Sequence, residues 1–249
     1  MLADIHAHLT DKAFASDLPA VLERAEKSGV RAIVCNGTNP GDNRKVLELA
    51  GKYSIVKAAL GLYPLEILKM TDDEIQSELE FIRKNKDKIA AIGEIGLDNY
   101  WEKGRLERQR QWLIKIKQLA EKLDKPMIVH SRAAEEETIG LLKDSEVPVV
   151  MHAFGGKPNL ARDAGRLYFS IPPNVVRSQQ MQKLVETVPL TRILTETDAP
   201  YLGPNAKERN EPANVALAVK KIAEIKKIME DEAGKILFDN FRKVIQWQA

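Results

Sequence analysis

Histidine is rare in this chain, and each copy lies at the end of a short apolar segment. The 249 residues include only four histidines, which are His6, His8, His130 and His152. Neutral imidazole is the commonest side-chain ligand for metal ions in proteins. In the run Asp4-Ile5-His6-Ala7-His8, residues i and i+2 of an extended strand point to the same side. His6 and His8 could therefore hold one metal ion, although a His-x-His pair alone also fits a chance surface pair.

The other two histidines repeat one local pattern. His130 follows Pro126-Met127-Ile128-Val129, and His152 follows Pro148-Val149-Val150-Met151. Each pattern is a proline, an apolar strand and a histidine at the end of the strand. A single histidine in such a place is more often a satisfied core residue. Two matching ones, together with the His-x-His pair, indicate a second metal ion.

Two carboxylates occupy similar positions. Glu94 lies within Ile92-Gly93-Glu94-Ile95-Gly96, where a buried carboxylate is costly unless it is paired or bound to a metal. Its two oxygens could bridge two cations, whereas the alternative is a salt-bridged structural glutamate. Asp198 follows Glu196-Thr197 and could both bind a metal and accept a proton from an activated water. Glu196 and Asp4 have weaker claims, as side chains that orient the ligands.

The segments that must position these residues alternate in type along the chain. Short β-like runs are separated by amphipathic helical stretches, which indicates parallel strands joined by crossover helices. Eight such units in about 250 residues predict a closed TIM (β/α)8 barrel of the α/β class, forming a single domain over residues 1–249. The predicted strands are Leu2–His6, Ala32–Asn36, Val56–Leu60, Ala90–Ile95, Pro126–His130, Val147–His152, Leu167–Ile171 and Arg192–Thr195. Their carboxyl ends would meet at one mouth, where active sites of such barrels lie.

Two helices are clearly marked. Thr71-Asp72-Asp73-Glu74 fits a capping box, in which Thr71 and Glu74 satisfy each other's backbone N–H groups. Residues from Leu106 to Leu123 place apolar side chains at helical spacing, with charged residues on the opposite face. We interpret that charged face as a solvated outer surface.

Composition limits the class of protein without naming a partner. Hydrophobic residues make up 44%, charged residues 30%, and the net charge is +2. This charge neither favours nor excludes nucleic acid as a partner, because a nuclease needs only a local basic rim.

The single cysteine, Cys35, precludes an internal disulfide; we expect a buried thiol in a reducing compartment. The chain has neither a signal-peptide pattern nor an apolar run of about 20 residues. We therefore expect a cytoplasmic protein with no membrane partner.

Five segments taken together resemble the TatD-type deoxyribonucleases, in the same order along nearly the whole chain. They are Asp4–His8, Gly93–Asp98, Val129–Arg132, Glu196–Tyr201 and Arg209–Pro212. The resemblance implies a metal-dependent hydrolase with two divalent ions that cleaves DNA phosphodiester bonds, often from the 3′ end. It also implies a ligand arrangement. One metal would be held by His6, His8 and Asp198, the other by His130 and His152, with Glu94 bridging the two.

The chain departs from the family pattern at the predicted mouth. Tyr63 stands in Gly61-Leu62-Tyr63-Pro64 where many relatives carry histidine, and Ala133 follows Arg132 where many carry aspartate. The segment from Met151 to Gly156 is also a looser version of the usual one. None of these changes removes a predicted ligand. They bear on substrate preference and rate.

The expected chemistry is metal-assisted hydrolysis, in which Asp198 and Glu94 are the catalytic carboxylates. Histidine-rich ligation suits zinc, manganese or nickel, whereas phosphoryl chemistry often uses magnesium, so we expect two ions of Mg, Mn or Zn. Two such ions would acidify a water and neutralise the phosphoryl oxygens, while Asp198 accepts the proton.

Several further residues are expected to contact a DNA substrate, which we expect to be single-stranded or to have frayed ends. Arg132 could hold the phosphate in a bidentate fork, although an ordinary salt bridge near the rim is the alternative. The remaining candidates for substrate binding are Tyr63, Arg209 and Asn210. Aromatic side chains could stack on bases, and these are Tyr100, Trp101 and Tyr201. For Trp101 we favour a packing role.

Two other functions compete with the nuclease. An amidohydrolase or deaminase acting on C–N bonds uses the same barrel and the same His-x-His opening, but often has a lysine on the fourth strand, where this chain has Glu94. The second alternative is a catalytically weak, metal-bearing protein that binds nucleic acid. The complete set of candidate ligands argues against it.

Overall fold

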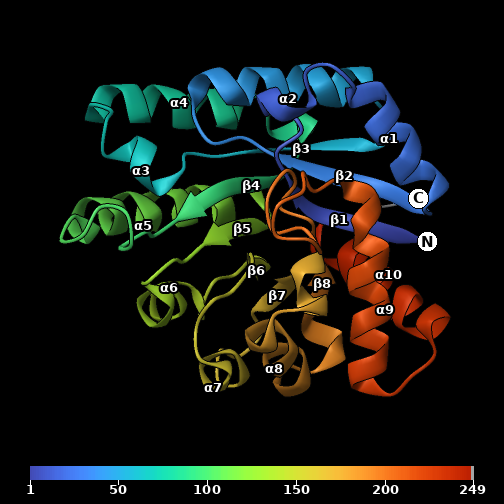
Figure 1. Cartoon of the computed structure of the whole chain (residues 1–249). Coiled ribbons are helices and arrows are strands. Elements are labelled where there is room, and N and C mark those ends of the chain that lie inside the picture. The colour runs from blue at the N-terminus through green and yellow to red at the C-terminus, as the bar shows by residue number, and fades with distance from the viewer. Residues whose placement is uncertain (248–249) are drawn as a thin grey trace.

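The chain folds into a nearly closed barrel of eight parallel strands surrounded by helices (Figure 1). The computed structural model describes residues 1–247. Neighbouring strands pair in parallel and in sequence order, from β1 to β8. The strands are β1 (Leu2–Ala7), β2 (Val30–Asn36), β3 (Val56–Leu60), β4 (Ile89–Gly96), β5 (Met127–His130), β6 (Val149–Met151), β7 (Tyr168–Ile171) and β8 (Ile193–Thr195). The TIM-barrel class predicted from the sequence is confirmed.

The junction between β8 and β1 differs from the other seven. In the described part of the chain no ladder pairs these two strands, and a single isolated bridge joins Ala7 of β1 to Ala199, which lies beyond the end of β8. Side chains and loop backbone complete the junction. The Thr195 hydroxyl donates to the Ala3 carbonyl at 2.7 Å, and the His8 N–H donates to the Ala199 carbonyl at 2.8 Å. The barrel is thus nearly closed, whereas the sequence predicted full closure.

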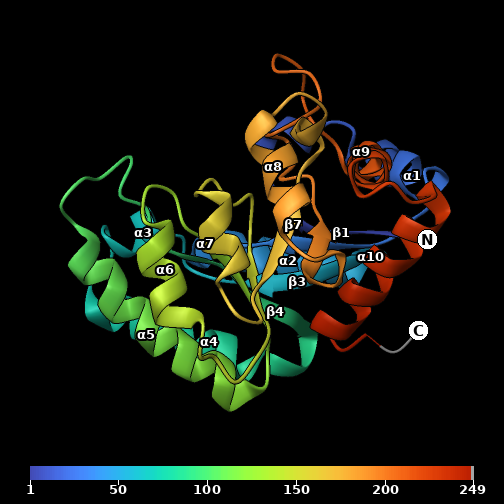
Figure 2. The ribbon, with the colours of Figure 1, turned by 90° about the horizontal axis from the view of Figure 1, so that it is seen from below.

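Helices cover the outside of the barrel, as the view from below shows (Figure 2). They are α1 (Leu18–Lys27), α2 (Pro40–Lys52), α3 (Pro64–Ile67), α4 (Asp72–Lys84), α5 (Leu106–Leu123), α6 (Glu135–Leu142), α7 (Pro158–Arg162), α8 (Gln179–Thr187), α9 (Val215–Lys226) and α10 (Glu230–Val244). Short 3-10 turns occur at Lys12–Phe14, Lys86–Lys88, Pro173–Val176, Leu190–Arg192 and Pro212–Asn214. No helix within residues 1–247 combines the length and the apolar character needed to cross a membrane.

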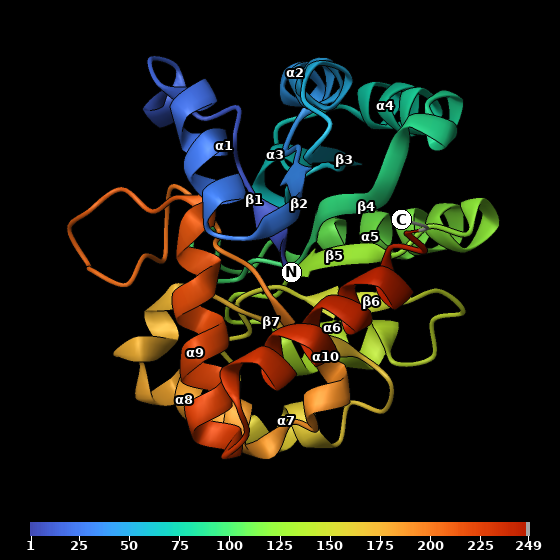
Figure 3. The same cartoon turned by 90° about the vertical axis from the view of Figure 1, so that its right-hand side faces the viewer.

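The last helix closes the end of the barrel at which the strands begin. Phe238 and Phe241 of α10 pack with apolar side chains of the barrel strands, including Ile5 and Val34. Figure 3 shows α10 lying across this end. Because this end is filled, the interior is open only where the strands finish, as is usual for active sites on this fold.

The local sequence signals correspond closely to these elements. The helix predicted from Leu106 to Leu123 has those bounds as α5, and the capping box of Thr71 and Glu74 is present at the start of α4. Cys35 is buried, as expected. Strand ends differ from prediction by up to two residues, and β6 ends at Met151. His152 is therefore the first residue beyond its strand.

Two glycines allow backbones to approach closely beside β4. A Cβ at Gly61 would lie 2.4 Å from the Glu94 carbonyl oxygen and 2.6 Å from its nitrogen. Gly96 has a φ of +142°, and a Cβ there would lie 1.9 Å from the His130 carbonyl oxygen. The Asn43 side chain holds Gly61 in place, since its amide donates to the Gly61 carbonyl at 2.9 Å and accepts from the Gly61 N–H at 3.1 Å. The backbone of Glu94 is thereby fixed from β3.

We expect Gly61→Ala to lower the free energy of unfolding by about 1–3 kcal/mol, because the added methyl group has no room. Gly140→Ala is the matched control, since Gly140 lies on the exposed side of α6 with open space around its Cα. That change should raise the free energy of unfolding by up to about 1 kcal/mol, the helix preference of alanine over glycine. Urea denaturation of both variants measures these effects. Equal stability of the two variants would contradict the close approach.

Candidate metal centre

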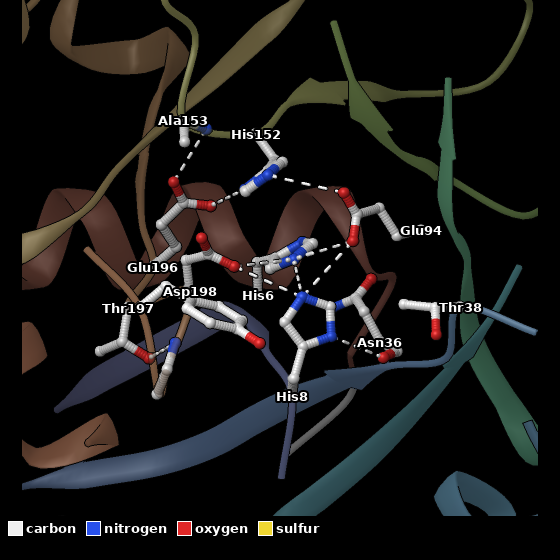
Figure 4. A network of polar contacts seen from close by, with 12 residues as sticks. His6, His8, Asn36, Thr38, Glu94, His152, Ala153, Glu196, Thr197 and Asp198 are labelled. Atoms are coloured by element: carbon white, nitrogen blue, oxygen red, sulfur yellow. Dashed lines mark hydrogen bonds and ion pairs between the residues drawn. The ribbon is translucent and has the colours of Figure 1, made fainter. Parts of the chain in front are cut away.

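All six side chains predicted as metal ligands converge at the open end of the barrel. They lie on β1, β4 and β5, directly after β1 and β6, and on the loop that follows β8, and Figure 4 shows five of them facing one another. His6, Glu94, His152 and Asp198 are buried, and the His8 and His130 side chains are each 13% exposed. Three overlapping groups of these residues bring their ligand atoms within 4.8 Å of one another.

Four ligand atoms lie together on one side of Glu94. They come from His6, His8, Asp198 and one oxygen of Glu94 itself. The Nε2 atoms of His6 and His8 are 3.1 Å apart, and each lies 3.4 Å from Asp198 Oδ1. Glu94 Oε2 lies 3.6 Å from His6 Nε2 and 3.4 Å from His8 Nε2. Ligands at about 2.0–2.2 Å from a tetrahedral ion lie about 3.3–3.6 Å from one another. These four atoms therefore fit around a single ion.

On the other side of Glu94, its second oxygen faces ligand atoms of His130 and His152. Glu94 Oε1 is 3.2 Å from His130 Nδ1 and 3.7 Å from His152 Nε2. The ring of His152 stacks on that of His6, with centroids 3.9 Å apart. The two oxygens of Glu94 thus face different histidine pairs, as a bridging carboxylate requires.

Hydrogen bonds on the far side of three imidazoles show what the cluster can bind. His8 Nδ1 donates to the Asn36 carbonyl at 3.1 Å, His152 Nδ1 to Glu196 Oε2 at 3.1 Å, and His130 Nε2 to Asp98 Oδ2 at 2.9 Å. These acceptors place the proton on the outer nitrogen. The inner nitrogen of each neutral ring then presents a lone pair toward the carboxylate of Glu94. Such an arrangement is repulsive unless a cation lies between them, so the donor set fits divalent metal ions.

Without a cation, protons balance the carboxylates instead. Burial raises the pKa of Glu94, but the hydrogen bond from His130 and the charge of His6 outweigh it and hold that pKa well below its usual range. Burial lowers the pKa of His8, but the hydrogen bond to Asp198 and the charge of Glu94 raise it to about 9. For His152, the charge and hydrogen bond of Glu196 overcome burial and raise the pKa to about 10.

Glu196 and Asp4 support the cluster in different ways. Glu196 is fully buried, holds His152, and accepts from the Ser170 hydroxyl at 2.7 Å. Among the described residues, no hydrogen bond or ion pair joins the Asp4 carboxylate to an imidazole. It accepts from the N–H of His6 at 3.1 Å and from the N–H of Thr197 at 2.9 Å. Asp4 therefore positions backbone next to the ligands, whereas Glu196 orients a ligand directly.

Sequence reasoning missed two residues of this support. Asn36 acts through its backbone carbonyl, which no side-chain pattern reveals. Asp98 lies in the segment Gly93–Asp98, and the sequence pattern assigned it no role, although an aspartate two residues beyond Gly96 at a strand end was a usable signal. Asp98 Oδ2 accepts from His130 and from the Tyr63 hydroxyl at 3.1 Å. Burial raises the pKa of Asp98, but the hydrogen bond from His130 outweighs it and lowers the pKa to about 2.

A cavity of about 800 Å³ opens above the cluster. Its lining includes Tyr63, Arg132, Trp101 and Tyr201 as well as cluster residues. The guanidinium of Arg132 stacks over the Tyr100 ring at 4.0 Å and lies 5.2 Å from the Trp101 ring. The interpretation of Trp101 as a packing residue was wrong, because Trp101 is 61% exposed.

Arg209 and Asn210 do not line this cavity. Arg209 forms a bidentate ion pair with Asp17, with both N–O distances at 2.7 Å. Asn210 is fully buried and donates its amide hydrogens to the carbonyls of Thr197 and Tyr201, each at 2.7 Å. The sequence predicted substrate contacts for both residues. In the structure they anchor the loop after β8 instead.

Comparison with known proteins agrees with this geometry. The family model described as TatD related DNase matches residues 3–246. The chain is 39% identical to the deoxyribonuclease TATDN3 of Homo sapiens, covering 98% of this chain and 94% of the human one. The solved structure of YjjV, a TatD homologue from Escherichia coli, has a TM-score of 0.92 at 28% identity, covering 99% and 98% of the two chains. An uncharacterized amidohydrolase from Saccharomyces cerevisiae, at 16% identity and a TM-score of 0.87 over 98% and 99% of the two chains, shares the fold.

Metal affinity should rise with pH, because a cation must displace the protons that His8 and His152 carry below their raised pKa values of about 9 and about 10. For each proton displaced, we expect affinity for Zn²⁺ or Mn²⁺ to increase about tenfold per pH unit between about pH 6 and 9. Calorimetric titration in buffers of different ionisation enthalpy measures both the affinity and the protons released. Affinity that stays constant with pH would contradict this ligand set.

Proposed function

The chain belongs to the TatD-related DNase family and is a metal-dependent hydrolase; we propose that it trims DNA from the 3′ end, using two divalent metal ions held by the six-residue cluster. The observation that carries this proposal is the position of Glu94, whose two oxygens face separate histidine pairs at 3.2–3.7 Å. A carboxylate shared in this way is typical of two-metal sites that cleave phosphodiesters.

The cluster divides into two proposed ligand sets. His6, His8 and Asp198 would hold one ion, His130 and His152 the other, and Glu94 would bind both. The ions would be Mg, Mn or Zn, since imidazole favours transition metals and phosphoryl chemistry commonly uses magnesium. When bound, they lower the pKa of a water and offset the charge of the phosphoryl oxygens.

Asp198 would accept the proton of the attacking water. It directs Oδ1 into the cluster, and its side chain is 12% exposed toward the cavity. Its backbone has a φ of +53°, uncommon for a residue other than glycine, and its N–H donates to the His6 carbonyl at 2.8 Å. This hydrogen bond holds the carboxylate against β1, where it can act as a general base.

Arg132 and Tyr63 would hold the scissile phosphate. Both line the cavity beside His130. The Arg132 guanidinium is oriented by stacking on Tyr100, and no ion pair within residues 1–247 involves it. It can therefore offer its fork of N–H groups to a phosphate. The Tyr63 hydroxyl, fixed by Asp98, lies 3.3 Å from His130 Nε2 and would contact the same group.

The depth of the site favours the end of a single strand. The cluster residues lie below the rim, with exposures of at most 13% for the side chains at its edge. A strand end can enter such a recess, whereas the middle of a duplex would have to open first. We therefore propose single-stranded or frayed DNA as the preferred substrate.

The alternatives have less support. Enzymes that hydrolyse C–N bonds share this fold but often have a lysine on the fourth strand. In this chain β4 carries Glu94 instead. A catalytically weak, metal-bearing protein that binds nucleic acid would have no need of six convergent ligands.

Linear single-stranded DNA labelled at its 5′ end should shorten stepwise from the 3′ end, because only an end enters the recess. Closed circular single-stranded DNA of the same sequence should resist cleavage under identical metal conditions. Time-resolved product ladders with Mg, Mn or Zn measure both reactions, and a panel of amides and esters controls for other hydrolysis. Internal cuts in the circle at the earliest times would refute end trimming.

Asp198→Asn should lower kcat by roughly 10²-fold or more, since asparagine keeps a ligating oxygen but cannot take the proton. Loss of metal should be partial because His6, His8 and Glu94 remain, whereas Glu94→Ala should deplete both ions. Asp11→Asn is the control, an aspartate on the cavity lining outside the cluster, and should retain activity. Elemental analysis and turnover at saturating metal separate these effects. Near-normal turnover of Asp198→Asn in excess metal would show that the base lies elsewhere.

A further inference from the structure

Two large aromatic side chains are exposed beside the cavity. Trp101 is 61% exposed and Tyr100 is 49% exposed, on the loop between β4 and α5. Their rings meet edge to face, with centroids 4.9 Å apart at 90°. Arg132 lies over both rings, and Trp101 and Arg132 line the cavity together. Exposed adjacent aromatics next to a catalytic cleft indicate a binding surface, because such area is usually buried.

The loop that carries these rings is tightly held at its base. Asp98 Oδ1 accepts from the N–H of Tyr100 at 2.8 Å and from the N–H of Trp101 at 3.0 Å. The Gln109 side chain pairs with both the N–H and the carbonyl of Asp98, at 2.7 and 2.9 Å. The Asn99 N–H donates to the Arg132 carbonyl at 3.0 Å. The aromatic residues are therefore anchored through their backbone although their rings face solvent.

Asp98 also connects this loop to the metal centre. Its Oδ2 accepts from His130 Nε2 at 2.9 Å, on the side of the ring away from Glu94. One carboxylate thus fixes both the aromatic loop and a ligand of the cluster. A group bound against Trp101 would be held at a set distance from the reacting phosphate.

We propose that Trp101, with Tyr100 meeting it edge to face and Arg132 lying over both rings, forms a stacking platform for the terminal nucleobase of the substrate strand. The inference rests on the proposed function. An aromatic face with an adjacent guanidinium is the chemistry by which proteins hold unpaired bases. Because every base has a π-face, the platform accepts any of the four bases. It specifies an unpaired base next to the scissile phosphate, so it selects for strand ends and not for sequence.

The test compares two oligonucleotides that differ only at the 3′-terminal residue, which carries a thymine in one and a tetrahydrofuran analogue without a base in the other. Trp101→Ala should lower kcat/KM on the thymine end by about 5- to 150-fold, the range for one lost stacked base. It should change kcat/KM little on the baseless end. Trp101→Phe should restore most of the activity, and Met229→Ala, which removes an exposed apolar side chain at the start of α10, should match the wild type.

Binding and metal content distinguish the platform from damage to the cluster. In an Asp198→Asn background, fluorescence anisotropy should show that Trp101→Ala weakens binding of the thymine-ended strand by a similar factor, with unchanged metal content. An equal effect on both strands, or no effect, would overturn the platform. If the wild type binds DNA but cleaves none, the proposed function fails, and the anisotropy comparison still decides the platform. If it binds neither strand, both proposals fail.

Discussion

The bridging position of Glu94 is the constraint on which the rest of the site depends. A carboxylate buried on an apolar strand is stable only with compensating positive charge on both sides, and this chain surrounds it with four histidines. For both oxygens to be used, the backbone of β4 must be placed within a fraction of an ångström. The close approaches at Gly61 and Gly96 achieve this, because neighbouring strands touch the β4 backbone with no side chain between. The two glycines therefore help to position the Glu94 carboxylate as well as to pack the strands.

The junction between β8 and β1 is the second feature on which the site depends. β8 and β1 lack a continuous ladder of backbone hydrogen bonds, and polar side chains take its place. Asp4 accepts from the N–H and hydroxyl of Thr197, at 2.9 and 2.5 Å. This frees the chain after β8 to turn inward, which brings Asp198 against His6. A regular ladder would keep the strand extended and alternate its side chains in and out. Incomplete closure therefore allows the last ligand to join the first two.

The sequence predicted the barrel and the six convergent side chains because both follow from short-range rules. Apolar runs separated by amphipathic helices define the strands, and a ligand at a strand end needs only the direction of its strand. The roles of Arg209, Asn210 and Trp101 depend on loop paths, which form from contacts between distant segments. Arg209, for example, meets Asp17 across 192 positions of the sequence. The Asn36 carbonyl is a backbone group, so residue type carries no information about it.

The outer partners of the histidines make the two halves of the cluster unequal. His8 donates to a neutral carbonyl, and the Nδ1 atom of His6 has no hydrogen-bond partner in the described part of the chain. His130 and His152 instead donate to the carboxylates of Asp98 and Glu196. A carboxylate partner makes an imidazole a stronger electron donor. The set with fewer ligands, His130 and His152, therefore has the more basic imidazoles, and their stronger electron donation offsets the smaller number of ligands. In the other set, Asp198 supplies the negative charge.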